Sequence, residues 1–218
     1  MPQRRKGMLH KVTAVRWPKV EGQRAYVKVL STAKKRELGF NPRQRIVCRT
    51  VKCGENMPAF SSALTLGNLL YPELFPKQIA SGLQQGGGIV TYSIVVDVNE
   101  ITKKGINSFY GIHGFGAEET YFSVLSVNIH RLNVRRRAKE LQKKILEDSG
   151  IRINSHEANI GEKVNKGLVC FDIMDIDLNI LKNKIRRIKN PLKRKQAINL
   201  FKELKRYSDS DGFIEVRV

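Results

Sequence analysis

The residues of this sequence that could do chemistry are chiefly lysines and arginines, and many of them occur in short runs. Their ammonium and guanidinium groups bind phosphate oxygens, and each contact with a nucleic-acid backbone releases condensed counterions. One charged run is usually a solvated surface, but five runs in a chain of net charge +20 favour phosphate binding. The candidate nucleic-acid-binding residues are Arg4, Arg5, Lys6, Lys34, Lys35, Arg36, Arg135, Arg136, Arg137, Arg186, Arg187, Lys193, Arg194 and Lys195.

Three aspartates offer a competing chemistry. Asp172, Asp175 and Asp177 lie close together in sequence, and alternation along a strand would place Asp175 and Asp177 on one face. Such a pair could hold Mg²⁺ in a phosphodiester-cleaving site. Alternatively, Asp177 begins the following helix, where the helix dipole favours an acid. We expect no catalytic residue and no metal, with a metal-dependent nuclease or other nucleic-acid-processing enzyme as the alternative.

The remaining motifs give little support for an enzyme. His113 lies between glycines and near Glu118 and Glu119, so it could act as a base, although a hydrogen-bonded structural histidine is commoner. The glycines at 86–88 precede a predicted strand instead of leading from a strand into a helix, so they do not form a nucleotide-phosphate loop. No nucleotide or dinucleotide motif is present, and we expect no cofactor.

Aromatic residues are candidates for stacking on bases only where they are exposed. Most of them fall in apolar stretches, where core packing explains them. Trp17 and Tyr26 lie among basic residues and are the better stacking candidates. Nothing in the sequence predicts readout of base edges.

The N-terminal two thirds of the chain is rich in predicted strands. The alternation of residues and the β-branched content predict strands over 11–16, 25–30, 45–52, 89–98, 109–115, 120–129 and 168–174. The segment 89–98 has the strongest β signal and should be a central strand. Arg45, Arg49 and Lys52 interrupt an apolar strand, which suggests a sheet with one apolar and one cationic face. Helices are predicted over 61–70, 76–83 and 134–148.

The C-terminal segment predicts a pair of basic helices. Leu181, Ile185 and Ile188 form one apolar stripe at helical spacing. Asn190-Pro191 has the residues preferred for an N-cap followed by the first helical position. In the second helix the residues expected to face inward are Ala197, Leu200, Phe201 and Leu204.

Together these elements predict an α+β fold. We expect a mainly antiparallel sheet with packed helices, a basic helical C-terminal segment and a short C-terminal strand from residue 213. The chain divides into a β-rich region with a basic N-terminal segment (1–133) and a basic α/β region (134–218), or it forms a single domain.

The positive charge is concentrated toward the two ends of the chain. Residues 1–52 hold fifteen lysines and arginines against two acids, and residues 182–218 hold twelve against four. Such sorting indicates an anionic partner, since a basic surface serving only solubility needs no segregation. We expect a nucleic-acid-binding structural protein of a ribonucleoprotein or viral assembly, with RNA favoured and phosphates contacted non-specifically. A viral matrix-type protein on an anionic membrane is a further alternative.

Cellular location follows from what the sequence lacks. No apolar run reaches the roughly 18 residues that span a bilayer, and the charged N-terminus lacks the apolar stretch of a signal peptide. Three cysteines, an odd number, suit free thiols in a reducing compartment. We therefore expect a cytoplasmic, nuclear or particle-enclosed protein, neither secreted nor transmembrane, that can assemble with other protein subunits.

Overall fold

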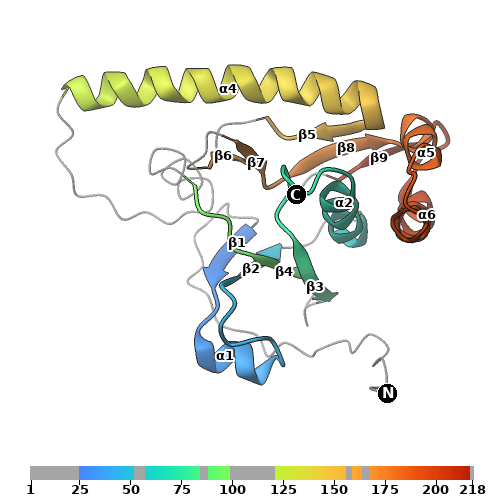
Figure 1. The fold of residues 1–218 in the computed structure, drawn as a ribbon, viewed down its shortest axis with the longest axis horizontal. Coiled ribbons are helices and arrows are strands. Elements are labelled where there is room, and N and C mark those ends of the chain that lie inside the picture. Colours follow the sequence, from blue (N-terminus) through green and yellow to red (C-terminus); the bar gives the residue numbers. More distant parts are fainter. Residues whose placement is uncertain are drawn as a thin grey trace.

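The computed structural model describes residues 25–51, 57–83, 88–98, 121–155, 159–163 and 167–216 (Figure 1). Its helices are α1 (Thr32–Glu37), α2 (Met57–Leu70), α4 (Tyr121–Ser149), α5 (Leu178–Arg186), α6 (Pro191–Leu204) and the 3₁₀ helix η2 (Lys205–Tyr207). Its strands are β1 (Ala25–Val29), β2 (Ile46–Val51), β3 (Gln78–Leu83), β4 (Ile89–Ile94), β5 (Ile151–Ile153), β6 (Ile160–Glu162), β7 (Leu168–Cys170), β8 (Ile173–Asp177) and β9 (Phe213–Glu215). The fold is α+β, as predicted.

A four-stranded antiparallel sheet forms the N-terminal part, with the strand order β1-β2-β4-β3. Strand β4 pairs with β2 on one side and β3 on the other, which confirms the predicted central strand. Four consecutive residues of β4, Ile89 to Tyr92, are buried. Their β-branched and aromatic side chains explain why this strand has the strongest β signal of the sequence.

The C-terminal part contains a three-stranded antiparallel sheet, β5-β8-β9, and the two-stranded β6-β7 pair. Helix α4 lies along β5 and β6, and α2 lies between the two larger sheets, where it contacts β8 as well as β3 and β4 (Figure 1). Helices α5 and α6 pack at one end, against α4 and α2 respectively. The predicted C-terminal strand is present as β9.

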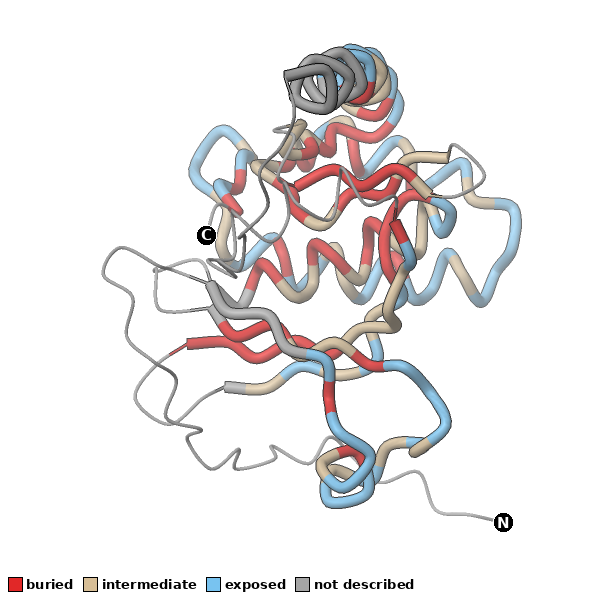
Figure 2. The backbone as a smooth tube through the Cα atoms, turned by 90° about the vertical axis from the view of Figure 1, so that its left-hand side faces the viewer, coloured by how far each residue is buried: buried red, intermediate tan, exposed pale blue. Residues whose placement is uncertain are grey.

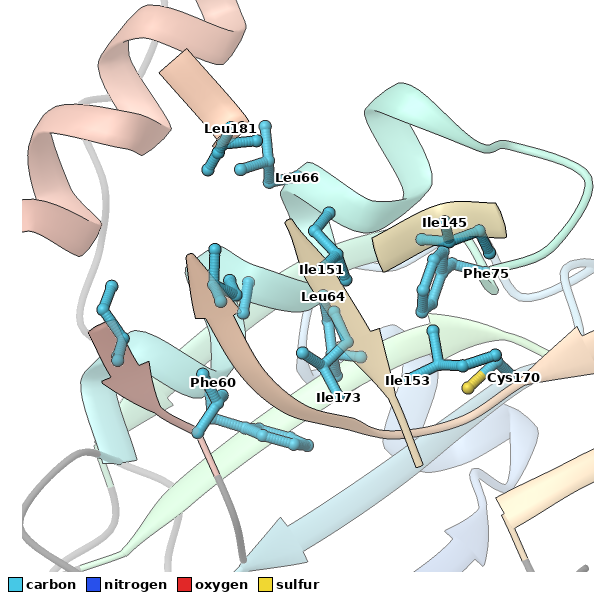
Figure 3. Close-up of a cluster of buried hydrophobic side chains, with 14 of the residues drawn as sticks. Phe60, Leu64, Leu66, Phe75, Ile145, Ile151, Ile153, Cys170, Ile173 and Leu181 are labelled. Atoms are coloured by element: carbon cyan, nitrogen blue, oxygen red, sulfur yellow. The ribbon is translucent and has the colours of Figure 1, made fainter. Parts of the chain in front are cut away.

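One apolar core joins these layers. Phe60, Leu66, Phe75, Ile151 and Ile173 are almost completely buried and belong to one cluster that also includes residues of α4, α5 and α6 (Figure 3). Figure 2 shows the buried stretches gathered between α4 and the four-stranded sheet, with the exposed stretches on outer turns. The basic helices are therefore anchored to the same core as the three-stranded sheet, whereas Leu30, Ile46, Val90 and Tyr92 form a second, smaller cluster in the four-stranded sheet region.

The junction between α4 and α5 depends on a glycine. Gly150 follows the last residue of α4 with φ +71° and donates its N–H to the Leu146 carbonyl at 2.8 Å. A Cβ atom at this position would lie 2.4 Å from the Asp177 carbonyl oxygen. The Asp177 N–H in turn donates to the Gly150 carbonyl at 2.8 Å, so the start of α5 is fixed against the end of α4.

Two local predictions were wrong, and one short helix was missed. Residues 76–83 were predicted as a helix but form the edge strand β3, and residues 120–129 were predicted as a strand whereas helix α4 begins at Tyr121. The short helix α1 occupies a segment for which no helix was predicted. The predicted strands over 11–16 and 109–115 lie outside the described residues.

The predicted division at residue 133 stays a prediction, although that position falls inside α4 and the core contains residues from both sides of it. Within the described parts of the chain, no helix has the length and apolar character needed to cross a membrane.

Candidate nucleic-acid interface

Helices α5 and α6 present the candidate interface, and each is positioned by a side-chain cap. The Asp177 carboxylate accepts hydrogen bonds from the N–H groups of Asn179 (2.8 Å) and Ile180 (3.3 Å). The Asn190 side chain accepts one from the Lys193 N–H at 2.9 Å, with Pro191 at the first helical position. The Asn190 cap was predicted, and the position of Asp177 at the start of α5 agrees with the alternative to metal binding; the two caps set where each helix begins.

The apolar stripes of the two helices face the core, as predicted. Leu181 and Ile185 of α5 and Ala197 and Leu204 of α6 are at most 4% exposed. Ile188, Leu200 and Phe201 are partly buried against the same core. Because one face of each helix is held in the interior, the charged residues on the other faces are directed toward solvent.

Seven cations form the surface that we call the basic helical pair. All seven are exposed except Lys193, which is partly exposed. Within the described chain, none of the seven forms a side-chain hydrogen bond or an ion pair with a carboxylate. The basic helical pair comprises Lys182, Arg186, Arg187, Lys189, Lys193, Arg194 and Lys195. Five of the seven were predicted; Lys182 and Lys189 were missed because each is a single cation, outside any run.

Two pockets open among these cations. One, of about 280 Å³, lies between α5 and α6 and is lined by Lys182, Ile185, Arg186, Arg194, Ile198 and Phe201. The other, of about 350 Å³, adjoins the start of α6 and is lined by Leu70, Lys184, Arg187, Ile188, Lys189, Asn190 and Lys193. Cations therefore surround concave surfaces as well as projecting from the helices.

Lys184 differs from its neighbours because it is neutralised. Its ammonium group pairs with Asp148 and lies 5.5 Å from the centre of the Tyr71 ring. The Tyr71 hydroxyl donates to the same carboxylate oxygen at 2.6 Å. Burial raises the pKa of Asp148, but the hydrogen bonds from Lys184 and Tyr71 outweigh burial and hold that pKa below its usual 3.8. This cluster joins the end of α4 to α5 and α2.

We expect Asp148→Asn to destabilise the protein at neutral pH. A carboxyl whose pKa is lowered by folding contributes stability above its unfolded pKa, and that contribution is lost as pH falls through the folded value. Because the Asp148 side chain is 41% exposed, solvent screening limits the loss to about 1 kcal/mol or less. Urea unfolding at pH 7 and near pH 3 measures this loss. The difference in free energy of unfolding between Asp148→Asn and wild type should be smaller at the lower pH.

Glu147→Gln is the matched control for Asp148→Asn. It removes the same charge from the neighbouring exposed position of α4, which has no ion pair in the described chain. A loss for Glu147→Gln equal to that for Asp148→Asn, or a loss independent of pH, would contradict the assignment of Asp148 as an anchor of α5.

The predicted cations of α1 are only partly available to a ligand. Lys35 is 7% exposed, and its ammonium donates to the carbonyls of Pro42 and Gln44, the second at 2.9 Å. Lys34 pairs with Glu37, whereas Arg36 is exposed. Arg4, Arg5 and Lys6 lie outside the described residues. The ammonium of Lys35 would have to leave two carbonyls to reach a phosphate.

The predicted triplet of α4 lies apart from the basic helical pair. Arg135 and Arg136 are exposed, and Arg137 pairs with the buried Glu162 of β6. At 1.5 Å per residue, Arg136 is about 20 Å along the helix from Ser149, where α5 packs. The structure therefore does not bring the α4 triplet onto the same patch as α5 and α6.

Neither Arg45 nor Arg49 supplies a free cation to the predicted cationic sheet face, and the third predicted cation, Lys52, lies outside the described residues. Arg45 makes a bidentate contact with Asp97 at 3.0 and 2.8 Å. The Arg49 side chain is 7% exposed and turns inward toward Asp172. The side chain of Tyr26, like the whole of Trp17, lies outside what the structure describes, so neither stacking prediction is tested.

Each of the three candidate metal-binding aspartates has a separate structural contact. Asp172 is buried beside Arg49, Asp175 pairs across the sheet with Arg152 at 3.4 Å, and Asp177 caps α5. Among the described residues there is no group of three or more His, Cys, Asp or Glu side chains that could hold a metal ion. His113 lies outside those residues.

A scan against protein-family models finds no matching family, and a search of curated proteins finds no significant similarity.

Proposed function

We propose that the protein binds nucleic acid, with RNA favoured, as a non-enzymatic structural component of a ribonucleoprotein or viral assembly. The observation that carries the proposal is the basic helical pair: five solvent-accessible cations on α5 and α6 and two, Arg187 and Lys189, on the connection between them. Within the described chain none of the seven lies within ion-pair distance of a carboxylate. Placing so many like charges together costs free energy in the free protein, and an anionic polymer removes that cost. Phosphate contacts of this kind carry no base sequence information.

The electrostatics of the surrounding residues support this proposal. Of the acids in the described chain, several neutralise cations away from α5 and α6, namely Arg45, Arg49, Arg137 and Arg152, and Asp148 neutralises Lys184 of α5. The acid within α6, Glu203, accepts a hydrogen bond from Ser62 of α2 at 2.9 Å. These carboxylates are thus already engaged by other groups, and among the described residues none of them forms an ion pair with the seven cations of the basic helical pair.

Salt-dependent binding tests the proposal directly. We expect purified protein to carry nucleic acid, seen in its ultraviolet absorbance ratio, and to bind labelled single-stranded RNA and DNA after that material is removed. Seven phosphate contacts at a slope of about 0.7 each give an upper limit of about 5 for the fall of log K with log salt. No binding at low salt, or binding independent of salt, would contradict the proposal.

A second candidate function is binding to an anionic membrane surface. Leu192 is 66% exposed beside Lys193 and Arg194, and Ile198 of the same helix is 39% exposed. Apolar side chains next to cations are typical of helices that lie on membranes. Flotation with vesicles that contain or lack acidic lipid tests this candidate, and binding to acidic vesicles without binding to RNA would favour it over our proposal.

Nuclease activity is favoured by no specific observation, since the three aspartates are committed to structural contacts. The same preparations nevertheless test it. Cleavage of labelled RNA or DNA with Mg²⁺ that is abolished by Asp175→Ala would overturn the non-enzymatic proposal.

A further inference from the structure

The pocket between α5 and α6 combines apolar walls with a cationic rim. On α5, Lys182, Ile185 and Arg186 are spaced i, i+3 and i+4, and on α6, Arg194 and Phe201 are spaced i and i+7. Residues so spaced share one side of a helix. The two helices thus line the pocket with three apolar side chains, including one aromatic ring, and three cations.

The side chains that line the pocket determine which kind of ligand it can bind. Apolar walls gain free energy when they cover an uncharged surface, while Lys182, Arg186 and Arg194 attract an anion. At about 280 Å³ the pocket is at the lower limit for small-molecule sites, which suits one small ring system. A nucleotide has both parts, a flat base and a phosphate. The Phe201 ring and the guanidinium planes of Arg186 and Arg194 are groups on which bases stack.

The charge outside the pocket favours a polymer over a free nucleotide. Lys189 and Lys193 line the second pocket, beside the start of α6, and Lys195 follows Arg194 on α6. A ligand that reaches these residues as well as the pocket must carry anions at repeated intervals. We infer that the pocket holds one unpaired base of a single-stranded nucleic acid whose phosphates lie along the basic helical pair. This inference rests on the proposed function and deepens it, because it selects single strands over duplexes.

Single-strand preference follows from the cost of freeing a base. In a duplex each base is paired and stacked, so it enters a protein pocket only after it is extruded. In a single strand it is already accessible. Phosphate contacts alone would not give this preference for single strands over duplexes, because both kinds of nucleic acid carry phosphates along the whole chain.

A pair of oligonucleotides with equal numbers of phosphates tests the inference. One is a labelled oligouridylate, and the other is the same length of abasic backbone. Fluorescence anisotropy with the full chain at several salt concentrations should give about tenfold tighter binding of the oligouridylate. The salt slopes of the two should agree, since the phosphate contacts are the same.

Phe201→Leu examines the pocket itself. This substitution removes the aromatic ring but keeps an apolar side chain at a partly buried position, so the fold should persist, and thermal unfolding checks that it does. We expect the preference for oligouridylate to fall several-fold while abasic binding is unchanged. Leu192→Ala is the matched control, because Leu192 is exposed on the same helix and does not line the pocket.

The possible outcomes separate the inference from the proposed function. Equal affinity for both oligonucleotides, with salt dependence retained, would overturn the pocket inference but leave phosphate binding standing. Binding to neither oligonucleotide would overturn both. Loss of acidic-vesicle binding in Phe201→Leu, with the oligouridylate preference intact, would make the pocket a lipid site and contradict the inference.

Discussion

Replacing Lys193, Arg194 and Lys195 together by alanine should weaken RNA binding by about tenfold or more at moderate salt and lower the salt slope by about 2. The slope change follows from three lost phosphate contacts at about 0.7 each. The three side chains lie in the first turns of α6, and none forms an ion pair in the described chain. Alanine favours helix, and the Asn190 cap accepts from a backbone N–H that the substitution keeps.

A control variant separates the effect of a lower net charge from the effect of removing charges at this particular site. Arg43→Ala, Lys77→Ala and Lys143→Ala, combined in one chain, remove the same three charges from exposed sites on three separate segments. We expect this control to change affinity much less and to keep nearly the wild-type slope. Equal slopes for the α6 variant and wild type would exclude this cluster as a phosphate-binding site. Equal losses in both variants would mean that net charge, and not the helical pair, governs binding.

The C-terminal helices were predicted correctly because their determinants are local. The stripe of Leu181 and Ile185, the Asn190 cap and Pro191 all act within a few residues of each other, so sequence spacing is sufficient to read them. The grouping of cations on α5 and α6 follows for the same reason: the two helices are separated by only four residues, 187–190. A candidate surface made by neighbouring elements is thus accessible to sequence analysis.

The mistaken elements depend on contacts between distant residues. The segment 76–83 is a strand because it pairs with β4, whose partner residues the local sequence does not reveal. At residues 120–129, β-branched residues indicated a strand, but from Tyr121 onward the backbone forms the first turns of the 29-residue helix α4. Once a helix is nucleated, adding turns is cheap. Tertiary pairing and cooperative extension both override local preference.

Which cations are available also depended on the tertiary structure. Lys35 belongs to a basic run like the others, yet it is buried against the Pro42 and Gln44 carbonyls. Arg137 belongs to an arginine triplet, yet it pairs with Glu162, which is 25 residues away. Runs of charge in a sequence show where cations are, but the fold decides which of them have already been neutralised.

Arg49 is the clearest case of a cation neutralised within the fold, because it is buried together with Asp172 between the two halves of the fold. Their side chains are 7% and 6% exposed, with the closest ion-pair atoms 3.7 Å apart. Arg49 also donates to the Phe171 carbonyl at 2.8 Å and lies 4.7 Å from the centre of the Phe60 ring. Asp172 accepts from the Ile173 N–H at 3.1 Å. The pair joins β2 to the segment between β7 and β8.

Removing one partner of this pair should cause the largest loss of stability that we expect from a single substitution. Arg49→Met leaves a buried carboxylate without its cation, at a cost of about 3–5 kcal/mol in the free energy of unfolding. Chemical denaturation of wild type and Arg49→Met at pH 7 measures this loss. The double variant Arg49→Met/Asp172→Leu should recover much of it, since no charge is then buried alone, and a double variant as unstable as the sum of both single variants would contradict the coupling.

The pH dependence of Arg49→Met provides an independent check on the same pair. Burial raises the pKa of Asp172, while Arg49 opposes the rise, so loss of the arginine should raise that pKa further. A carboxyl whose folded pKa lies above its unfolded value contributes stability at low pH that is lost as pH rises through the folded value. We therefore expect Arg49→Met to be less destabilised, relative to wild type, at pH 5 than at pH 8. If the loss of stability in Arg49→Met is the same at pH 5 and pH 8, Asp172 does not titrate between these pH values. Lost packing against Phe60 would then be the cause of the instability.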